Sequence, residues 1–235
     1  MSRPACQTCR VTQTDFDYSN LSGRPPGPVL TWASRLLAGV REVQATVVPY
    51  AEAWQAHNRA AVAADGPLWV TLGDSMAQGI GASAYDKGWA GQLAGLIDPS
   101  YRHVNLSVSG GRVEDLFERQ VPAMQLLGTP ALVTVIIGSN DLVSKRQRQL
   151  LPGRLATLVP LLPDGTVMAT MPGGRPGALD FNRQLADADN IVVCDFQDRR
   201  MASWRGKLAA DHFHPNDLGY AGMAALMAEA VLNGR

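Results

Sequence analysis

The sequence predicts an α/β fold in which a parallel sheet of five strands is covered by helices on both faces. From Leu68 onward, short apolar segments that suit strands alternate with segments that suit helices, which is typical of such a sheet. Two of the strand segments end directly before clusters of Gly, Ser and Asn, and sites in parallel sheets form beyond the carboxyl ends of the strands. With 46% hydrophobic and 18% charged residues, the composition is that of a globular domain.

The first 66 residues are expected to form an extension outside this sheet. Residues 1–28 are predicted to be disordered or loosely packed. Apolar residues recur at steps of three and four over residues 29–48, which predicts an amphipathic helix that Pro49 interrupts. A second helical segment follows over residues 50–64 and stops at Asp65-Gly66-Pro67. We therefore expect a segment 1–28, a helical extension 29–66 and a main domain 67–235.

The helix over residues 29–48 has two interpretations. The favoured one is a helical arm that packs on the main domain. The alternative is a peripheral contact with a membrane surface or a partner, because Trp32 and Leu36 widen its apolar face. Arg35, Arg41 and Glu42 argue against a membrane-spanning helix.

The main domain is expected to contain five strands and five helices. The strands are predicted at residues 68–72, 103–106, 131–137, 166–170 and 191–194. The helices are predicted at residues 89–96, 113–127, 150–161, 181–188 and 217–232, the last with Asn216 as its N-cap.

Charge and cysteine content exclude several classes of function. The formal net charge of zero argues against a nucleic-acid or anionic-membrane role driven by bulk electrostatics. Cys6 and Cys9 form a single CxxC without further zinc ligands nearby, and Cys194 lies in an apolar run. This cysteine usage, together with the lack of a recognisable signal peptide, predicts a cytoplasmic protein without a disulfide framework.

The stretch from Val70 to Gly81 carries the first candidate for catalysis. It reads as a strand that runs into a Gly-rich turn with Ser75 at its apex, before a presumed helix start. A Gly-Asp-Ser tripeptide alone is a common coincidence, and a serine nucleophile needs a base, a group that orients the base, and donors for an oxyanion.

The segment Asp211-His212-Phe213-His214-Pro215 can supply the base. Asp211 and His214 lie three apart, so the carboxylate can meet Nδ1 of the imidazole and leave Nε2 for a serine. A metal pair is the alternative, but no third ligand stands out, and we expect neither a metal nor a cofactor. His57 and His103 are expected to be structural.

Two loops can supply the oxyanion donors. The segment 105–111 follows the second strand, and its glycines let a backbone N–H approach a substrate oxygen. The segment 138–141 follows the third strand, and the Asn140 amide can add a side-chain donor. Asp74 and Asp141 are expected to fix their loops by accepting backbone hydrogen bonds.

Together these four segments resemble the SGNH (GDSL-type) hydrolase superfamily over Trp69 to about Val231. The hallmark blocks stand in order as Leu72-Gly-Asp-Ser75, Asn105-Leu-Ser-Val-Ser-Gly110, Gly138-Ser-Asn-Asp141 and Asp211-His-Phe-His-Pro215. The resemblance implies a flavodoxin-like three-layer α/β/α sandwich and an esterase or lipase activity. It implies that Ser75 is the nucleophile, His214 the base and Asp211 its orienting carboxylate. The oxyanion hole would be the backbone N–H groups of Ser75 and Gly110 with the Asn140 side chain.

This sequence departs from the superfamily at two positions near the predicted site. Ser107 and His212 stand where many members have glycine. His212 could compete for Asp211 or line the substrate pocket.

The expected reaction is therefore cleavage of a carboxylic ester, with an acyl ester or a lysophospholipid-like molecule as the substrate. Lys145, Arg146 and Arg148 could steer an anionic acyl donor, although a solvated helix face is the favoured interpretation. The loop 171–177 could form a pocket wall. The alternative function is phosphate or nucleotide binding by the Gly-rich loop 73–81 at a helix N-terminus.

Overall fold

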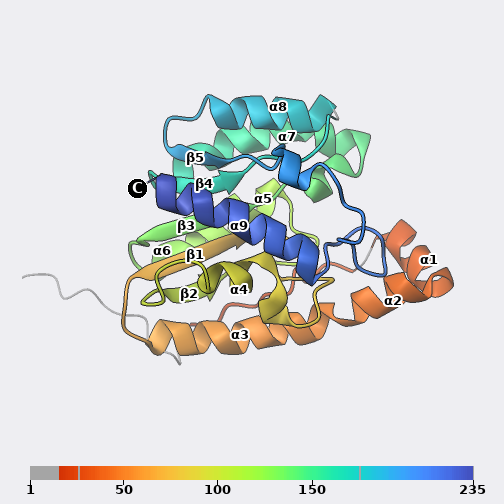
Figure 1. The fold of residues 1–235 in the computed structure, drawn as a ribbon, viewed down its shortest axis with the longest axis horizontal. Coiled ribbons are helices and arrows are strands. Elements are labelled where there is room, and N and C mark those ends of the chain that lie inside the picture. Colours follow the sequence, from red (N-terminus) through yellow and green to blue (C-terminus); the bar gives the residue numbers. More distant parts are fainter. Residues whose placement is uncertain (1–15, 26, 175, 235) are drawn as a thin grey trace, which may run out of the picture.

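The computed structural model describes residues 16–25, 27–174 and 176–234, and its centre is a five-stranded parallel sheet (Figure 1). The strand order is β2-β1-β3-β4-β5, and all four neighbouring pairs run parallel. The strands are β1 (Leu68–Gly73), β2 (Arg102–Asn105), β3 (Leu132–Ile136), β4 (Thr166–Ala169) and β5 (Ile191–Cys194). The predicted α/β fold with a parallel sheet is confirmed, because each predicted strand overlaps one of these.

Helices cover both faces of the sheet, which makes three layers (Figure 1). Val70 and Leu72 point into a core formed with α5 (Val113–Asp115), α6 (Val121–Leu126), α7 (Lys145–Leu158) and α8 (Pro176–Ala186). Trp69 points into the opposite core, formed with α4 (Trp89–Ala94) and α9 (Asp217–Asn233). The alternation of neighbouring residues between two cores follows from the period of two along a strand.

The topology brings the loops of interest to one edge of the sheet. Strand β1 lies between β2 and β3, so the loops that follow these three strands lie side by side. The loop after β2 continues along the end of β1, where Val108 N–H donates to Gly73 O at 3.2 Å.

The N-terminal helices differ from the prediction of one helix over residues 29–48 that ends at Pro49. The structure has α1 (Pro28–Leu36), α2 (Ala38–Ala45) and α3 (Val47–Ala63), with Leu37 in an extended conformation between the first two. Pro49 lies in the first turn of α3. Proline is tolerated there because the N–H groups of a first turn have no partner within the helix, so Pro49 helps to begin a helix rather than to end one.

Similar corrections apply to helices of the main domain. Helix α7 begins at Lys145, earlier than predicted, because the Ser144 hydroxyl caps it by accepting from Gln147 N–H at 3.2 Å. The predicted helix over residues 113–127 is interrupted by a π-helical turn at Leu116–Gln120. No helix begins directly after Ser75 in the described chain, because residues 74–83 form turns and bends that lead to the 3-10 helix Tyr85–Lys87.

The expectation that residues 1–28 are disordered or loosely packed is wrong for the part that the structure describes. We call residues 16–24 the N-terminal strap. Phe16, Tyr18 and Asn20 are buried, with exposed fractions of 7%, 9% and 1%. The two aromatic rings join the core that contains Leu106 and Val108, so apolar burial holds the strap in place. Residues 1–15, with Cys6 and Cys9, lie outside the described residues.

The helical extension is packed at one end and exposed at the other. Trp54 of α3 is fully buried against the sheet edge, and its Nε1–H donates to Gln78 O at 3.0 Å. Trp32 and Leu36 of α1 are 66% and 61% exposed. The contact with a membrane or partner through residues 29–48 stays a prediction. None of the helices in the described ranges combines the length and hydrophobicity needed to cross a bilayer.

Candidate active site

Ser75, His214 and Asp211 form a hydrogen-bonded chain. Asp211 Oδ2 lies 2.6 Å from His214 Nδ1, and His214 Nε2 lies 2.9 Å from Ser75 Oγ. Since an ionised carboxylate can only accept, Nδ1 carries the proton and Nε2 is free to accept from the serine hydroxyl. Ser75 and His214 are 4% and 6% exposed. The structure thus brings together the three side chains that the sequence analysis selected.

A tight turn before α9 orients the base. The Asp211 carboxylate accepts from the backbone N–H groups of Phe213 and His214, each at 3.0 Å. Burial raises the pKa of Asp211, but the hydrogen bonds and charge of His214 and these backbone donors outweigh burial, so the pKa lies below its ordinary value. Asp211 is therefore ionised at neutral pH and holds the imidazole.

His212 lies in the left-handed region, with φ of 55°. A residue with a Cβ carries about 1–2 kcal/mol of strain there, so this position is one that glycine would occupy without strain. Asp211 hydrogen-bonds to the His214 ring and to backbone groups, and none of its bonds in the described chain involves the His212 ring. His212 therefore does not compete for Asp211, and it lines the pocket described below.

The turn that carries Ser75 is packed tightly on both sides. A side chain on Gly73 would collide with Ile136 O, and one on Gly81 would collide with the Cβ of His214. Both glycines also have positive φ, at 154° and 96°. The Gln120 side chain accepts from Gly73 N–H and donates to Gly73 O, both at 2.8 Å. Ser75 is thereby held by its neighbours on both sides of the turn.

The two predicted oxyanion loops meet beside this turn. Asn140 Nδ2 donates to Gly111 O at 2.9 Å and lies 3.4 Å from Asp74 Oδ2. Gly110 has φ of 74°, and there is open space where its side chain would be. Among the described residues, no hydrogen bond uses the backbone N–H of Ser75 or Gly110. Neither of these two N–H groups therefore has a partner in the described part of the chain.

Asp74 joins the turn that carries Ser75 to the Asn140 loop. Its carboxylate accepts from Met76 N–H at 2.9 Å and from Ser139 Oγ–H at 2.8 Å. Burial raises the pKa of Asp74 to about 6, although these hydrogen bonds and the nearby His214 act in the opposite direction. Asp141 accepts from Val113 N–H at 3.0 Å and pairs with Arg154. Both acids fix loops, as their positions in the sequence suggested.

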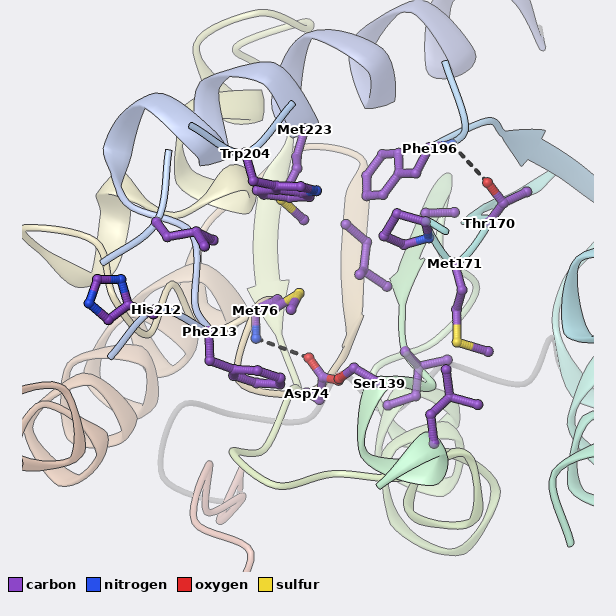
Figure 2. A pocket seen from close by; sticks show the side chains of 16 residues that line it. Asp74, Met76, Ser139, Thr170, Met171, Phe196, Trp204, His212, Phe213 and Met223 are labelled. Atoms are coloured by element: carbon purple, nitrogen blue, oxygen red, sulfur yellow. Dashed lines mark hydrogen bonds between the residues drawn. The ribbon is translucent and has the colours of Figure 1, made fainter. Parts of the chain in front are cut away.

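A pocket of about 450 Å³ opens next to the triad (Figure 2). It lies between the carboxyl ends of β3 and β4, the start of α9 and the segment 204–213. Its walls are mainly apolar, and its polar side chains include Asp74, Ser139 and Thr170. The side chains labelled on its apolar walls in Figure 2 are Met76, Met171, Phe196, Trp204, Phe213 and Met223.

The pocket reaches the triad through the neighbours of its members. Asp74 and Met76 flank Ser75, and Phe213 precedes His214. Met171 and Pro172 belong to the loop that was expected to form a wall. In contrast, Lys145, Arg146 and Arg148 are exposed on α7 and are not among the residues that line the pocket.

Sequence reasoning missed the residues that hold the site loops. Gln78, Gln120 and Asn20 are buried polar residues whose side chains bond to backbone groups of other segments. Gln78 lies in the turn that carries Ser75, so its position in the sequence could have indicated a role in holding the site. Asn20 and Gln120 had none, because their partners are more than 40 residues away in the chain. In the described chain, no three His, Cys, Asp or Glu side chains gather as a metal site would require.

Comparisons with known proteins identify the family and the fold of this chain. The model of the GDSL-like lipase/acylhydrolase family matches residues 71–221. No curated protein matches the chain significantly.

Solved structures share the fold at low sequence identity. TesA is 20% identical, with a TM-score of 0.57, over 72% of this chain and 99% of its own. A putative lipolytic protein of the G-D-S-L family from Desulfitobacterium hafniense is 18% identical, with a TM-score of 0.56, over 70% and 99%. The extracellular lipase from Streptomyces rimosus is 18% identical, with a TM-score of 0.52, over 70% and 100%.

Proposed function

Because this chain belongs to the GDSL-like lipase/acylhydrolase family, we propose that it is a serine hydrolase that cleaves carboxylic esters through Ser75, His214 and Asp211. The observation that carries the proposal is the continuous hydrogen-bonded chain from Asp211 Oδ2 to Ser75 Oγ, next to an open pocket. A buried serine and histidine at 2.9 Å are poised for proton transfer.

The proposed reaction is a two-step acyl transfer. Ser75 Oγ attacks the ester carbonyl while His214 Nε2 takes the hydroxyl proton, and Asp211 stabilises the resulting imidazolium. The N–H groups of Ser75 and Gly110 and the Asn140 amide stabilise the negative oxygen of the tetrahedral intermediate. The alcohol leaves with the proton from His214. Water, deprotonated by His214, then attacks the acyl-enzyme, and the carboxylic acid is released as Ser75 regains its proton.

Removal of the nucleophile tests this reaction. Ser75→Ala should abolish covalent labelling by a fluorophosphonate and reduce hydrolysis of nitrophenyl acetate on the order of 10⁶-fold, as loss of a triad serine does elsewhere. Labelling is read by intact mass and turnover by nitrophenol release. Ser100→Ala is the matched control, because Ser100 is exposed before β2 at the opposite end of the sheet. Persistent turnover in Ser75→Ala would refute the scheme.

We further propose that the 450 Å³ pocket holds the acyl chain of a medium-chain ester. Its size lies within the range of roughly 300–1,000 Å³ that is typical of small-molecule sites, and its apolar walls suit a hydrocarbon chain. Met76 and Phe213 line the pocket and are sequence neighbours of Ser75 and His214, so an acyl chain bound at the serine can extend into the pocket. Lysophospholipids, whose acyl chains are of this chemical kind, remain within the proposed class.

A chain-length series of nitrophenyl esters tests the substrate class. The ratio of kcat/KM for octanoate to that for acetate should exceed one in the wild type. Ala169→Leu, which enlarges a pocket-lining side chain, should lower this ratio by about tenfold or more, since each methylene excluded from a hydrophobic pocket reduces transition-state binding. Val193→Leu on β5, which is not among the lining residues, is the control. An equal loss with both esters would contradict the assignment of the pocket.

Phosphate or nucleotide binding by the loop 73–81 is less well supported. The space next to Gly73, Gly79 and Gly81 is filled by the protein's own backbone and side chains. In addition, residues 74–83 do not present a helix N-terminus to a phosphate. Nucleotide-dependent thermal stabilisation without fluorophosphonate labelling would favour this alternative.

A further inference from the structure

The N-terminal strap crosses the segment that leads to the predicted oxyanion donor. Tyr18 donates its hydroxyl hydrogen to Leu106 O at 2.5 Å. Two residues later, Asn20 Nδ2 donates to Asn105 O and to Ser107 O, both at 2.9 Å. Asn20 is only 1% exposed. The strap therefore bonds to three consecutive carbonyl groups just before Gly110.

Asn20 also bonds to the turn that carries the nucleophile. Gln78, three residues after Ser75, donates from Nε2 to the backbone oxygen of Asn20 at 2.6 Å and to Ser107 O at 3.0 Å. The Asn20 and Gln78 side chains thus share one acceptor, Ser107 O. Through Asn20, three segments that are far apart in the sequence meet in a buried polar cluster.

Helix α3 completes this cluster from the other side. Asn58 Nδ2 donates to Asn20 Oδ1 at 3.2 Å and to Asn105 O at 2.7 Å. Asn58 Oδ1 accepts from Asn105 N–H at 2.8 Å. Every side-chain polar atom of Asn20 is therefore satisfied, which makes its position well determined at low dielectric.

We propose that Asn20 is a positioning residue that sets the nucleophile turn and the Gly110 loop relative to each other. The proposal rests on the proposed function, in which Ser75 and Gly110 supply the two backbone donors of one oxyanion hole. Asn20 touches neither substrate nor triad, and it lies outside residues 71–221, where the family model matches. Its action is therefore a property of this chain's extension rather than of the matched domain.

The chemistry favours an effect on turnover rather than on folding alone. Without the Asn20 amide, Ser107 O still accepts from Gln78 and Asn105 O still accepts from Asn58. The loop should consequently stay folded but lose one lateral anchor. Oxyanion donors act only when they lie at hydrogen-bond distance from the developing charge, so a small displacement of Gly110 should weaken the transition state more than the bound substrate.

The test compares Asn20→Ala with Tyr18→Phe, which removes a buried hydrogen bond from the same strap but leaves Ser107 and Gln78 untouched. Active sites are counted by fluorophosphonate titration, so that unfolded protein does not enter kcat. The affinity for an alkyl trifluoromethyl ketone, which forms a tetrahedral adduct with a reactive serine, reports the oxyanion hole. Asn140→Ala gives the scale for complete loss of one donor, about 10²–10³-fold.

Asn20→Ala should lower kcat per titrated site by about tenfold, with KM within twofold and a parallel loss of ketone affinity. Tyr18→Phe should keep the wild-type kcat per titrated site at a similar loss of thermal stability. Asn20→Ser, which retains one donor, should lie between Asn20→Ala and the wild type, and it provides the measurement if Asn20→Ala does not fold.

The proposal would be overturned if the Asn20 variants kept the wild-type kcat per titrated site and the wild-type ketone affinity. It would also be overturned if Tyr18→Phe lost as much kcat and ketone affinity as Asn20→Ala. A wild-type protein that does not react with the fluorophosphonate would overturn the proposed function and this assignment together. A reactive wild type whose Asn20 variants match it would overturn this assignment alone.

Discussion

Asp74 precedes Ser75 of the candidate triad, and its carboxylate is enclosed by protein. Because burial raises its pKa to about 6, the folded state binds a proton more readily than the unfolded state, whose pKa is near 3.8. The contribution of Asp74 to stability therefore falls as the pH rises from about 4 to 6 and stays low above 6. The site retains an ionised group that opposes folding at neutral pH.

Asp74→Asn should accordingly raise the free energy of unfolding at pH 7.5 by about 1–3 kcal/mol, the equivalent of the pKa shift, and by little at pH 4. Urea unfolding at both pH values measures this difference. Turnover should fall, because an amide whose oxygen accepts from Ser139 and Asn140 places its NH2 group against the Met76 N–H, which needs the second carboxylate oxygen as its acceptor. The same pH dependence of unfolding in both proteins would contradict this interpretation.

At the scale of residues, the sequence predicted the chemical groups but not their supports. Ser75, Asp211 and His214 were found because their types and spacing are tied to a known chemistry. Asn20 and Gln120 are ordinary polar residues whose role depends on the backbone atoms that they meet after folding. No local pattern encodes such a meeting, so a sequence alone does not distinguish them from surface amides.

Among the elements, β2 carries a buried histidine that should make the fold sensitive to acid. His103 stacks on Trp69 with a ring distance of 3.7 Å and shares a hydrogen bond with Thr71 Oγ1 at 2.8 Å. Burial, followed by the nearby His57, lowers the pKa of His103 well below its ordinary value. As the pH falls below about 6.5, the unfolded chain takes up a proton that folded His103 does not, so stability is lost.

We expect His103→Gln to remove part of this loss. Between pH 7.5 and 5.5, the wild type should lose about 1.4 kcal/mol more unfolding free energy than the variant, which corresponds to one pH unit below the unfolded pKa. Urea midpoints at the two pH values give the slopes, and absolute stability does not enter the comparison. His57 and Asp74 are present in both proteins, so their contributions to the pH dependence of unfolding cancel in the comparison. Parallel slopes would show that His103 does not cause the acid sensitivity.

Elements were predicted well where burial decides them and poorly where a single residue decides a boundary. Five strands were located from their apolar composition, since a strand covered on both faces has little choice of residues. Proline misled the prediction at Pro49, whereas Pro152 lies inside α7 and also inside the helix predicted over residues 150–161. A proline alone does not say whether it begins, interrupts or ends a helix, because this depends on which carbonyl groups are already engaged.

For the whole molecule, the strap and α3 join the extension to the loops of the candidate site. The boundary at residue 67, predicted from the helix stop at residues 65–67, separates Trp54, Asn58 and Asn20 from the loops to which they bond. A chain that begins at residue 67 would lack Phe16 and Tyr18, which pack in the same core as Val104 and Leu106.

A chain that begins at residue 67 should therefore lose most ester hydrolysis and expose apolar surface. The expected readouts are a loss of nitrophenyl acetate turnover of at least about tenfold and increased binding of an apolar dye, compared with the full chain at equal concentration. A chain that begins at residue 16 is the control and should keep the activity of the full chain. Full activity in the chain that begins at residue 67 would contradict a structural role for the extension.

The strap also sets the order in which the molecule can be completed. Its hydrogen bonds to the β2 loop join residues 85 to 88 positions apart, although the strap is synthesised before β2. Contacts between residues so far apart in the sequence form late. Closing the long intervening loop costs conformational entropy until the intervening chain is itself ordered. We expect the strap to dock late although it is synthesised before the sheet, so that the sheet forms before the loop after β2 is fixed.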